Sequence, residues 1–234
     1  MGVVNVTPDS FFDAEVNFSP TDAVASARRM MEDGAAIVDV GGESTRPGSE
    51  GTSAEEELRR VLPVLEGLGD EVPLSIDTAK AGVAWQALAL GVEMVNDVTA
   101  LRGDARMAEV VADEGAYLCL MHMQGEPRTM QVDPTYDDVV ADVARFLEER
   151  VAFAVAQGVP EELICLDPGI GFGKTVEHNF ELIRRLDELT ALGRPVLVGL
   201  SRKSSLGRVL GDSEAKTGPL SASLAAAGRR SSRG

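Results

Sequence analysis

The segment Ala36-Ile37-Val38-Asp39-Val40-Gly41-Gly42-Glu43-Ser44-Thr45-Arg46-Pro47-Gly48 joins a short apolar run to a polar loop rich in glycine. The apolar run has the length and composition of a buried β-strand. The glycines allow tight turns that residues with a Cβ atom avoid. A carboxylate, two hydroxyls and a guanidinium therefore follow the carboxyl end of a strand, where α/β proteins bind ligands. A solvated surface turn is the alternative interpretation, and the recurrence of polar segments after other strands favours a binding loop.

The rest of the chain repeats the order of strand, polar loop and helix. Apolar runs predict strands at about 2–6, 36–40, 72–76, 92–96, 116–121, 163–166 and 195–199. Helical patterns lie near 20–33, 54–68, 80–90, 104–114, 135–157, 177–191 and 202–210. A glycine stands before five of the strands, at positions 34, 91, 115, 158 and 193, as turns out of a helix require. These repeats predict an α/β fold of parallel strands with right-handed connections.

Seven β/α units predict a (β/α)8 TIM barrel that is incomplete, because the sequence offers no eighth strand after residue 210. The barrel domain is predicted to span residues 1–216, with no internal linker. Residues 217–234 have an unusual composition and are assigned to an atypical tail, either disordered or read from a shifted frame.

Composition narrows the possible partners. The formal net charge of −16, with no broad basic face, argues against a nucleic-acid partner. No signal peptide precedes the first strand, and no apolar run approaches the roughly 18 residues of a membrane span. The expected location is therefore cytoplasmic, without a membrane partner. Cys119 and Cys165 lie in apolar runs and are expected to be reduced, buried thiols.

Polar residues recur just after the strands, while the strand interiors stay apolar. Asp77, Asp167, Asn96 and Lys203 all hold such positions, and in a barrel these positions face one bowl. Each has a structural alternative: Asp77 suits a helix cap, and Asn96 suits a turn. Considered together, two carboxylates, an amide and a cation suit a flat heterocycle rich in hydrogen-bonding groups. Nearby, Met121 is expected to form a wall of the site.

Two further strand-end residues, Asn5 and Arg46, suit an anionic leaving group at the rim of the bowl. Arg46 would bind the anion directly, and Asn5 would bind it through a hard divalent cation such as Mg2+. A lone histidine after a buried strand, such as His122, is more often a packing residue than a ligand.

Several common motifs are absent. Residues 167–175, Asp-Pro-Gly-Ile-Gly-Phe-Gly-Lys-Thr, look like a phosphate loop, but a Walker A motif needs glycine where Pro168 stands. A G-x-G-x-x-G motif fails because its last glycine would be Lys174. No H-E-x-x-H or C-x-x-C spacing supports a zinc site, and no G-x-S-x-G elbow supports a hydrolase triad.

Seven segments of the chain closely resemble dihydropteroate synthases, in order and spacing, over residues 1 to about 211. The segments are Asn5-Val6-Thr7-Pro8-Asp9-Ser10-Phe11, residues 41–48, Ser75-Ile76-Asp77-Thr78, Asn96-Asp97-Val98, Leu120-Met121-His122, residues 167–172 and Ser201-Arg202-Lys203-Ser204. The resemblance implies a pterin-binding TIM barrel that condenses 7,8-dihydropterin-6-ylmethyl diphosphate with p-aminobenzoate. It implies the products 7,8-dihydropteroate and pyrophosphate, a place in folate biosynthesis, sulfonamide competition, Mg2+ and a homodimer.

The resemblance also implies a role for each matching residue. The catalytic residues would be Asp77, Asp167, Lys203, Arg46 and Asp9. The metal contact would be Asn5. The substrate-binding residues would be Asn96, Val98, Met121, Gly199, Phe172, Thr45, Pro47, Ser204, Phe11 and Asp13. Among these, Asn96 joins the acids in holding the pterin, and Phe172 and Ser204 lie around the aminobenzoate.

Two departures from the family pattern leave alternatives open. The family's last strand ends in an Arg-x-His pair that this sequence lacks, and Ala14-Glu15 replaces the usual Gly-Gly of the first loop. A catalytically impaired or inactive remnant that still binds pterin is therefore the alternative function. A corrinoid-linked methyltransferase with a similar barrel ranks lower, because it does not explain residues 201–204 or 44–47.

Overall fold

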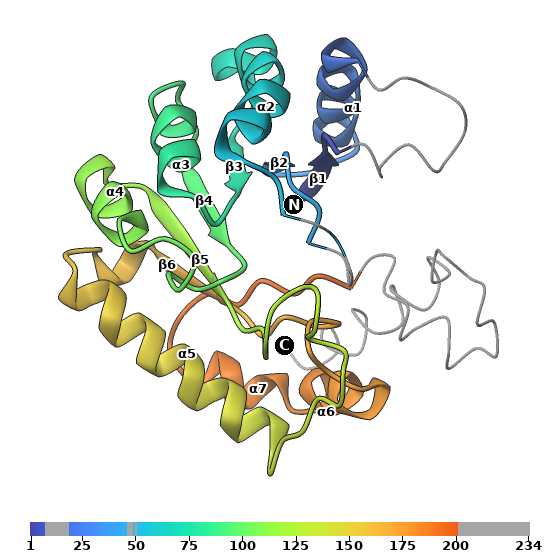
Figure 1. Ribbon diagram of the computed structural model, residues 1–234, viewed down its shortest axis with the longest axis vertical. Coiled ribbons are helices and arrows are strands. Elements are labelled where there is room, and N and C mark those ends of the chain that lie inside the picture. The colour runs from blue at the N-terminus through green and yellow to red at the C-terminus, as the bar shows by residue number, and fades with distance from the viewer. Residues whose placement is uncertain (8–18, 46–48, 50, 201–234) are drawn as a thin grey trace, which may run out of the picture.

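Six parallel strands form one sheet in the computed structural model, which describes residues 1–7, 19–45, 49 and 51–200 (Figure 1). The strands are β1 (Gly2–Asn5), β2 (Val38–Gly41), β3 (Leu74–Asp77), β4 (Met94–Asp97), β5 (Tyr117–Met121) and β6 (Ile164–Asp167). Each strand pairs with the next one along the chain, in the order β1-β2-β3-β4-β5-β6. The predicted α/β class with parallel strands is confirmed, and this strand order is that of a TIM barrel.

Helices follow the strands and lie side by side along the outside of the sheet (Figure 1). They are α1 (Pro20–Glu32), α2 (Ala54–Leu68), α3 (Ala81–Leu88), α4 (Met107–Glu114), α5 (Val139–Ala156), α6 (Val176–Arg184) and α7 (Leu186–Thr190). Short 3-10 turns lie at Gly69–Glu71 and Glu161–Leu163. The single helix predicted at 177–191 is wrong, because the backbone leaves the helical conformation at Arg185 (φ −108°, ψ 26°) and divides it into α6 and α7.

The predicted seventh strand, 195–199, is present only as one parallel bridge between Val196 and Leu166 of β6. The Leu166 amide donates to the Pro195 carbonyl over 2.9 Å, and the Leu197 amide donates to the Leu166 carbonyl over 2.8 Å. Pro195 has no N–H to extend the ladder, which keeps the pairing short. The helix expected at 202–210, the region after residue 210 where no eighth strand is predicted, and the tail at 217–234 lie outside the described residues.

Glycines end the helices as the sequence predicts. All five glycines at positions 34, 91, 115, 158 and 193 have positive φ angles, between 63° and 98°. Residues with a Cβ atom rarely adopt this conformation, so these positions turn the chain from each helix toward the next strand. The helices predicted from residues 20 and 54 begin at those residues, where Ser19 and Ser53 cap α1 and α2 with their hydroxyl groups.

The two faces of the sheet differ in chemistry. Side chains on the outer face, such as Val40, Ile76 and Leu118, are fully buried against the helices in one continuous apolar core. The inner face carries most of the polar strand residues, which alternate with the apolar ones along each strand. In the part of the chain that the structure describes, no helix has the length and apolar character needed to cross a bilayer.

Candidate functional site

One level of the sheet brings together residues from all six strands. In the strand register, Asn5 lies opposite Gly41, Gly41 opposite Asp77, and Asp77 opposite Asn96. The same level continues through Cys119 to Cys165. An atom in the Cβ position of Gly41 would lie 3.4 Å from Asn5 Oδ1 and 3.4 Å from Asp77 Cβ, so both side chains flank the bare glycine. The structure therefore brings together the predicted residues Asn5, Asp77 and Asn96.

A second carboxylate lies one level below this row. The Asn96 Nδ2 atom donates to Asp39 Oδ2 over 3.0 Å, and Asp39 is 4% exposed. The Asn96 Oδ1 atom is buried and has no hydrogen-bond partner among the described residues. No role for Asp39 is predicted from the sequence. The sequence feature that could have indicated it is a carboxylate inside an apolar strand. Asp39 lies two residues before Gly41 and therefore on the same, inner face of the sheet.

The inner face is strongly acidic. Asp77 keeps some exposed surface, yet burial raises the pKa of its carboxyl group well above the ordinary value, and the charges of Asp39, Glu57, Asp97 and Glu43 raise that pKa further. Asp97 follows Asn96 and therefore points to the outer face, where burial also raises its pKa. Such a site favours ligands that bring hydrogen-bond donors or positive charge, because they relieve the cost of a desolvated carboxylate.

Asp167 provides the predicted second acid at the end of β6. It pairs with Met121 and lies two residues beyond Cys165, so it points to the inner face one level above the row. It is 8% exposed, and its Oδ1 atom accepts from the Gly169 amide over 2.7 Å. Asp77, Asn96 and Asp167 thus occupy the carboxyl ends of three strands of one sheet.

A small apolar cluster adjoins these acids and is separate from the main core. The predicted residues Val98 and Met121 belong to it, and the predicted residue Phe172 packs against it. Met123 and Met130 complete the cluster. Sequence reasoning missed these two methionines, because they lie in an irregular segment without a periodic pattern. Flexible thioethers and an aromatic ring make a suitable wall for a planar ligand.

The loop between β6 and α6 folds around its own lysine. Lys174 is 3% exposed, and its Nζ atom lies 2.9 Å from His122 Nδ1. It also donates to the carbonyl oxygens of Gly169 (3.0 Å) and Phe172 (2.9 Å). Burial, with the charges of Lys174 and Arg102, lowers the pKa of His122 to about 2, so its ring is neutral and Nδ1 can accept. Lys174 therefore shapes the loop, and His122 is the packing residue that the sequence predicts.

A partly buried ion-pair network that the sequence did not reveal supports the loop after β2. The Lys80 Nζ atom lies 2.7 Å from Glu43 Oε2 and 2.5 Å from Glu57 Oε2. The other oxygen of Glu43 accepts from the Thr52 amide over 2.6 Å. Burial lowers the pKa of Lys80, but hydrogen bonds to both glutamates outweigh that effect and the pKa lies above its ordinary value. The network holds the base of the loop that carries Thr45.

Other predicted site residues are not placed by the structure. Arg46, Pro47, Asp9, Phe11, Asp13, Lys203 and Ser204 lie outside the described residues. Gly199 is exposed, beyond the bridge that joins residues 195–197 to β6. Within the described ranges, no group of three or more His, Cys, Asp or Glu side chains is arranged to hold a metal ion.

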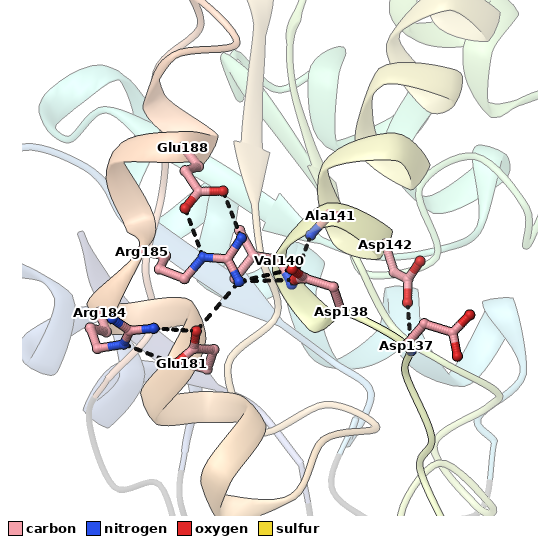
Figure 2. A network of polar contacts seen from close by, with 9 residues as sticks. All are labelled: Asp137, Asp138, Val140, Ala141, Asp142, Glu181, Arg184, Arg185 and Glu188. Atoms are coloured by element: carbon pink, nitrogen blue, oxygen red, sulfur yellow. Dashed lines mark hydrogen bonds and ion pairs between the residues drawn. The ribbon is translucent and has the colours of Figure 1, made fainter.

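A surface hollow of about 410 Å³ lies elsewhere, between the end of β5 and the start of α5. It is lined by His122, Gln124, Thr135, Tyr136, Asp137, Asp142 and Arg145. Beside it, a polar network ties the junction of α6 and α7 to the first turn of α5 (Figure 2). There Arg185 binds both carboxylate oxygens of Asp138 at 3.0 Å, and Asp138 caps α5. The hollow is separate from the candidate site, because its lining includes none of the acids at the strand ends.

Comparisons with known proteins agree on one family. The family described as pterin binding enzyme matches residues 1–232. The dihydropteroate synthase of Escherichia coli (strain K12) is 46% identical over 231 residues, covering 97% of this chain and 82% of the relative. The Xanthomonas albilineans dihydropteroate synthase with 4-aminobenzoic acid matches with a TM-score of 0.87 at 46% identity, over 98% of this chain and 83% of that one. The Yersinia pestis enzyme with a sulfonamide drug matches with a TM-score of 0.89 at 42% identity, over 97% and 82%.

Proposed function

The chain belongs to the family of pterin-binding enzymes, as a dihydropteroate synthase, and from this premise we propose how its residues carry the reaction. The reaction is a transfer: 7,8-dihydropterin-6-ylmethyl diphosphate and p-aminobenzoate give 7,8-dihydropteroate and pyrophosphate. The observation that carries the assignment of residues is the convergence of Asp77, Asn96 and Asp167 on one acidic inner face. The 4-aminobenzoic acid bound by the Xanthomonas albilineans relative supports the second substrate. The drug complex of the Yersinia pestis relative supports sulfonamide competition.

The acids and the amide suit the pterin ring. Carboxylates accept hydrogen bonds from ring N–H and amino groups, and an amide both donates and accepts. The apolar cluster of Val98, Met121, Met123, Met130 and Phe172 gives the planar ring a wall on one side. Lys203, whose role comes from the sequence, would add a donor for the ring's acceptor atoms.

The chemistry needs no covalent intermediate on the protein. The bond between the pterin methylene carbon and the diphosphate oxygen breaks, and its electron pair leaves with pyrophosphate. The amino nitrogen of p-aminobenzoate forms the new bond to that carbon and releases one proton. Positive charge builds up on the pterin between these events, and the buried carboxylates of Asp77 and Asp167 stabilise it electrostatically. Holding both substrates in place supplies much of the remaining rate.

We also propose that Mg2+ assists, with Asn5 as its contact on the protein. Asn5 is exposed at the end of β1, and its amide oxygen is a hard ligand of the kind that Mg2+ accepts. A single protein ligand fits, because Mg2+ at phosphate sites keeps several waters and substrate oxygens. When bound, the ion would supply positive charge to the departing diphosphate. Arg46 would neutralise the same charge from the loop after β2.

The test is pyrophosphate release from both substrates with Mg2+, compared between the unchanged protein and two variants. Asp77→Asn removes the buried charge and is expected to lower kcat by at least about 100-fold, as the loss of an electrostatic stabiliser does. Asp33→Asn makes the same chemical change at an exposed residue after α1 and should keep full activity. Pterin binding without pyrophosphate release by the unchanged protein would instead favour the inactive, pterin-binding remnant. Normal kinetics from folded Asp77→Asn would remove Asp77 from the mechanism.

A further inference from the structure

The hydrogen bond between Asn96 and Asp39 lies directly beneath the proposed pterin site. Asp39 lies on β2 and is only 4% exposed. Asn96 lies on β4, opposite Asp77 of β3. The contact crosses β3, because β2 and β4 are separated by that strand in the sheet. Its length of 3.0 Å is that of a good hydrogen bond. Asp39 therefore contacts Asn96, one of the residues proposed to bind the pterin, from the side away from the ligand.

This contact decides which way the amide of Asn96 faces. An asparagine amide has two nearly isosteric ends, and its neighbours determine which end is the oxygen. An ionised carboxylate only accepts hydrogen bonds, so it must face the NH2 end of the amide. The other end, Oδ1, is buried without a partner among the described residues. One acceptor atom and the second N–H of the amide are thus left for a ligand.

Burial and the hydrogen bond from Asn96 act on the carboxyl group of Asp39 in opposite directions. Burial raises the pKa of its carboxyl group above the ordinary value, and the hydrogen bond from Asn96 acts in the opposite direction without reversing the shift. Ser75 lies beside Asp39 in the strand register and is fully buried. Among the described residues, Ser75 Oγ and Asp39 Oδ1 have no hydrogen-bond partner, so Asn96 is the side-chain donor to this carboxylate there.

We propose that Asp39 is a positioning residue that fixes the Asn96 amide, so that Asn96 presents one acceptor and one donor to the edge of the pterin ring. The inference rests on the proposed function and deepens it. Asp39 acts only through Asn96 and does not touch the pterin. Its loss would let the amide rotate or reverse, and the reversed amide would present a donor where the ring also has a donor.

A double-mutant cycle separates this role from a merely structural one. The affinity for 6-hydroxymethylpterin is measured by calorimetry for the unchanged protein, Asp39→Leu, Asn96→Ala and the double variant. Asp39→Leu is expected to weaken binding by about 10-fold, as the loss of one well-placed hydrogen bond does. In the Asn96→Ala background the same change should have no further effect, because the residue through which Asp39 acts is gone. Equal effects in both backgrounds would overturn the proposal.

Two controls keep the result interpretable. Asp39→Asn keeps an acceptor oxygen for the Asn96 amide and should retain most of the affinity. The side chain of Asp39→Ser is too short to reach Asn96, so this variant should lose as much affinity as is expected for Asp39→Leu. It replaces Asp39→Leu in the cycle if that variant does not fold. Val95→Ala disturbs the outer face of β4, where Val95 is fully buried, and should lower stability without changing pterin affinity. If Asp39→Asn loses as much affinity as Asp39→Ser, the proposal is wrong. If the unchanged protein binds no pterin, the proposed function fails as well.

Discussion

At the scale of single residues, the candidate site contains a carboxylate whose charge destabilises the folded protein. Asp77 carries a carboxylate at a position where burial and four other acids oppose its charge. The folded protein therefore holds a proton on Asp77 more readily than the unfolded chain does. A position that weakens the fold and serves the ligand is typical of functional sites.

Asp77→Asn should make the protein more stable while it removes activity. The pKa of Asp77 is raised in the folded state, so its contribution to stability is greatest below the ordinary value of 3.8 and is lost as pH rises through the folded pKa. Asparagine does not titrate. The variant should therefore gain roughly 1 kcal/mol in the free energy of unfolding at pH of about 7, and less at pH of about 4. Urea unfolding at both pH values checks this, and an equal gain at both would contradict it.

The sequence predicted the residues that stand at strand ends and missed those whose roles depend on distant neighbours. Asp77, Asn96 and Asp167 could be predicted because polar residues end apolar runs there. Asp39 and Lys80 could not be predicted, since their roles depend on neighbours far along the chain. Asp39 accepts a hydrogen bond from Asn96 across β3, and Lys80 binds one glutamate in the loop after β2 and another on α2. A linear pattern shows which face a residue lies on, but not which side chain lies opposite.

At the scale of elements, the loop between β6 and α6 depends on the bare backbone of Gly169. This residue has φ +66°, and a Cβ atom there would overlap the carbonyl oxygen of His122. Gly34 has φ +98° with nothing within 4 Å of its Cβ position, so it offers a matched control.

Gly169→Ala should therefore be much more harmful than Gly34→Ala. The control suffers only backbone strain of about 1 kcal/mol, whereas the loop variant must also move β5 or the loop itself and should lose at least about 3 kcal/mol. Thermal unfolding of the two variants measures the difference. Similar losses would mean that the loop adapts to the extra methyl group.

Lys80→Met should destabilise the protein by about 3–5 kcal/mol, because it leaves the fully buried carboxylate of Glu57 without its cation. Adding Glu57→Gln removes that buried charge and should recover most of the loss. Urea unfolding of the unchanged protein, the single variant and the double variant checks both statements. A double variant as unstable as Lys80→Met would show that the charge of Glu57 is not the cause.

Element types were more predictable than their ends and interruptions. Helix α2 begins and ends where the sequence predicts, and the ends of the six strands lie within two residues of their predicted positions. The division between α6 and α7 was missed because Arg185 is a good helix former. Its side chain instead binds Asp138 on the start of α5, a tertiary contact that residues 177–191 alone do not reveal (Figure 2).

At the scale of the whole molecule, the net charge of −16 works against compactness. Raising NaCl from about 10 mM to about 300 mM screens this repulsion and should raise the melting temperature by a few degrees. Exposed ion pairs such as Arg59–Glu56 weaken under the same change, but each contributes little. Calorimetry in both buffers measures the shift. A lower melting temperature in high salt would show that attractive pairs outweigh the general repulsion.

The alignment of Asn5, Gly41, Asp77 and Asn96 at one level of the sheet limits how the gene can change by insertion or deletion. Because successive side chains alternate between faces, losing one codon inside β3 would send Asp77 toward the helices and bring an apolar neighbour inward. Losing a codon between elements would leave the level intact. Lineages of this gene should therefore gain and lose codons in the segments between strands and helices, and hardly ever within the strands themselves.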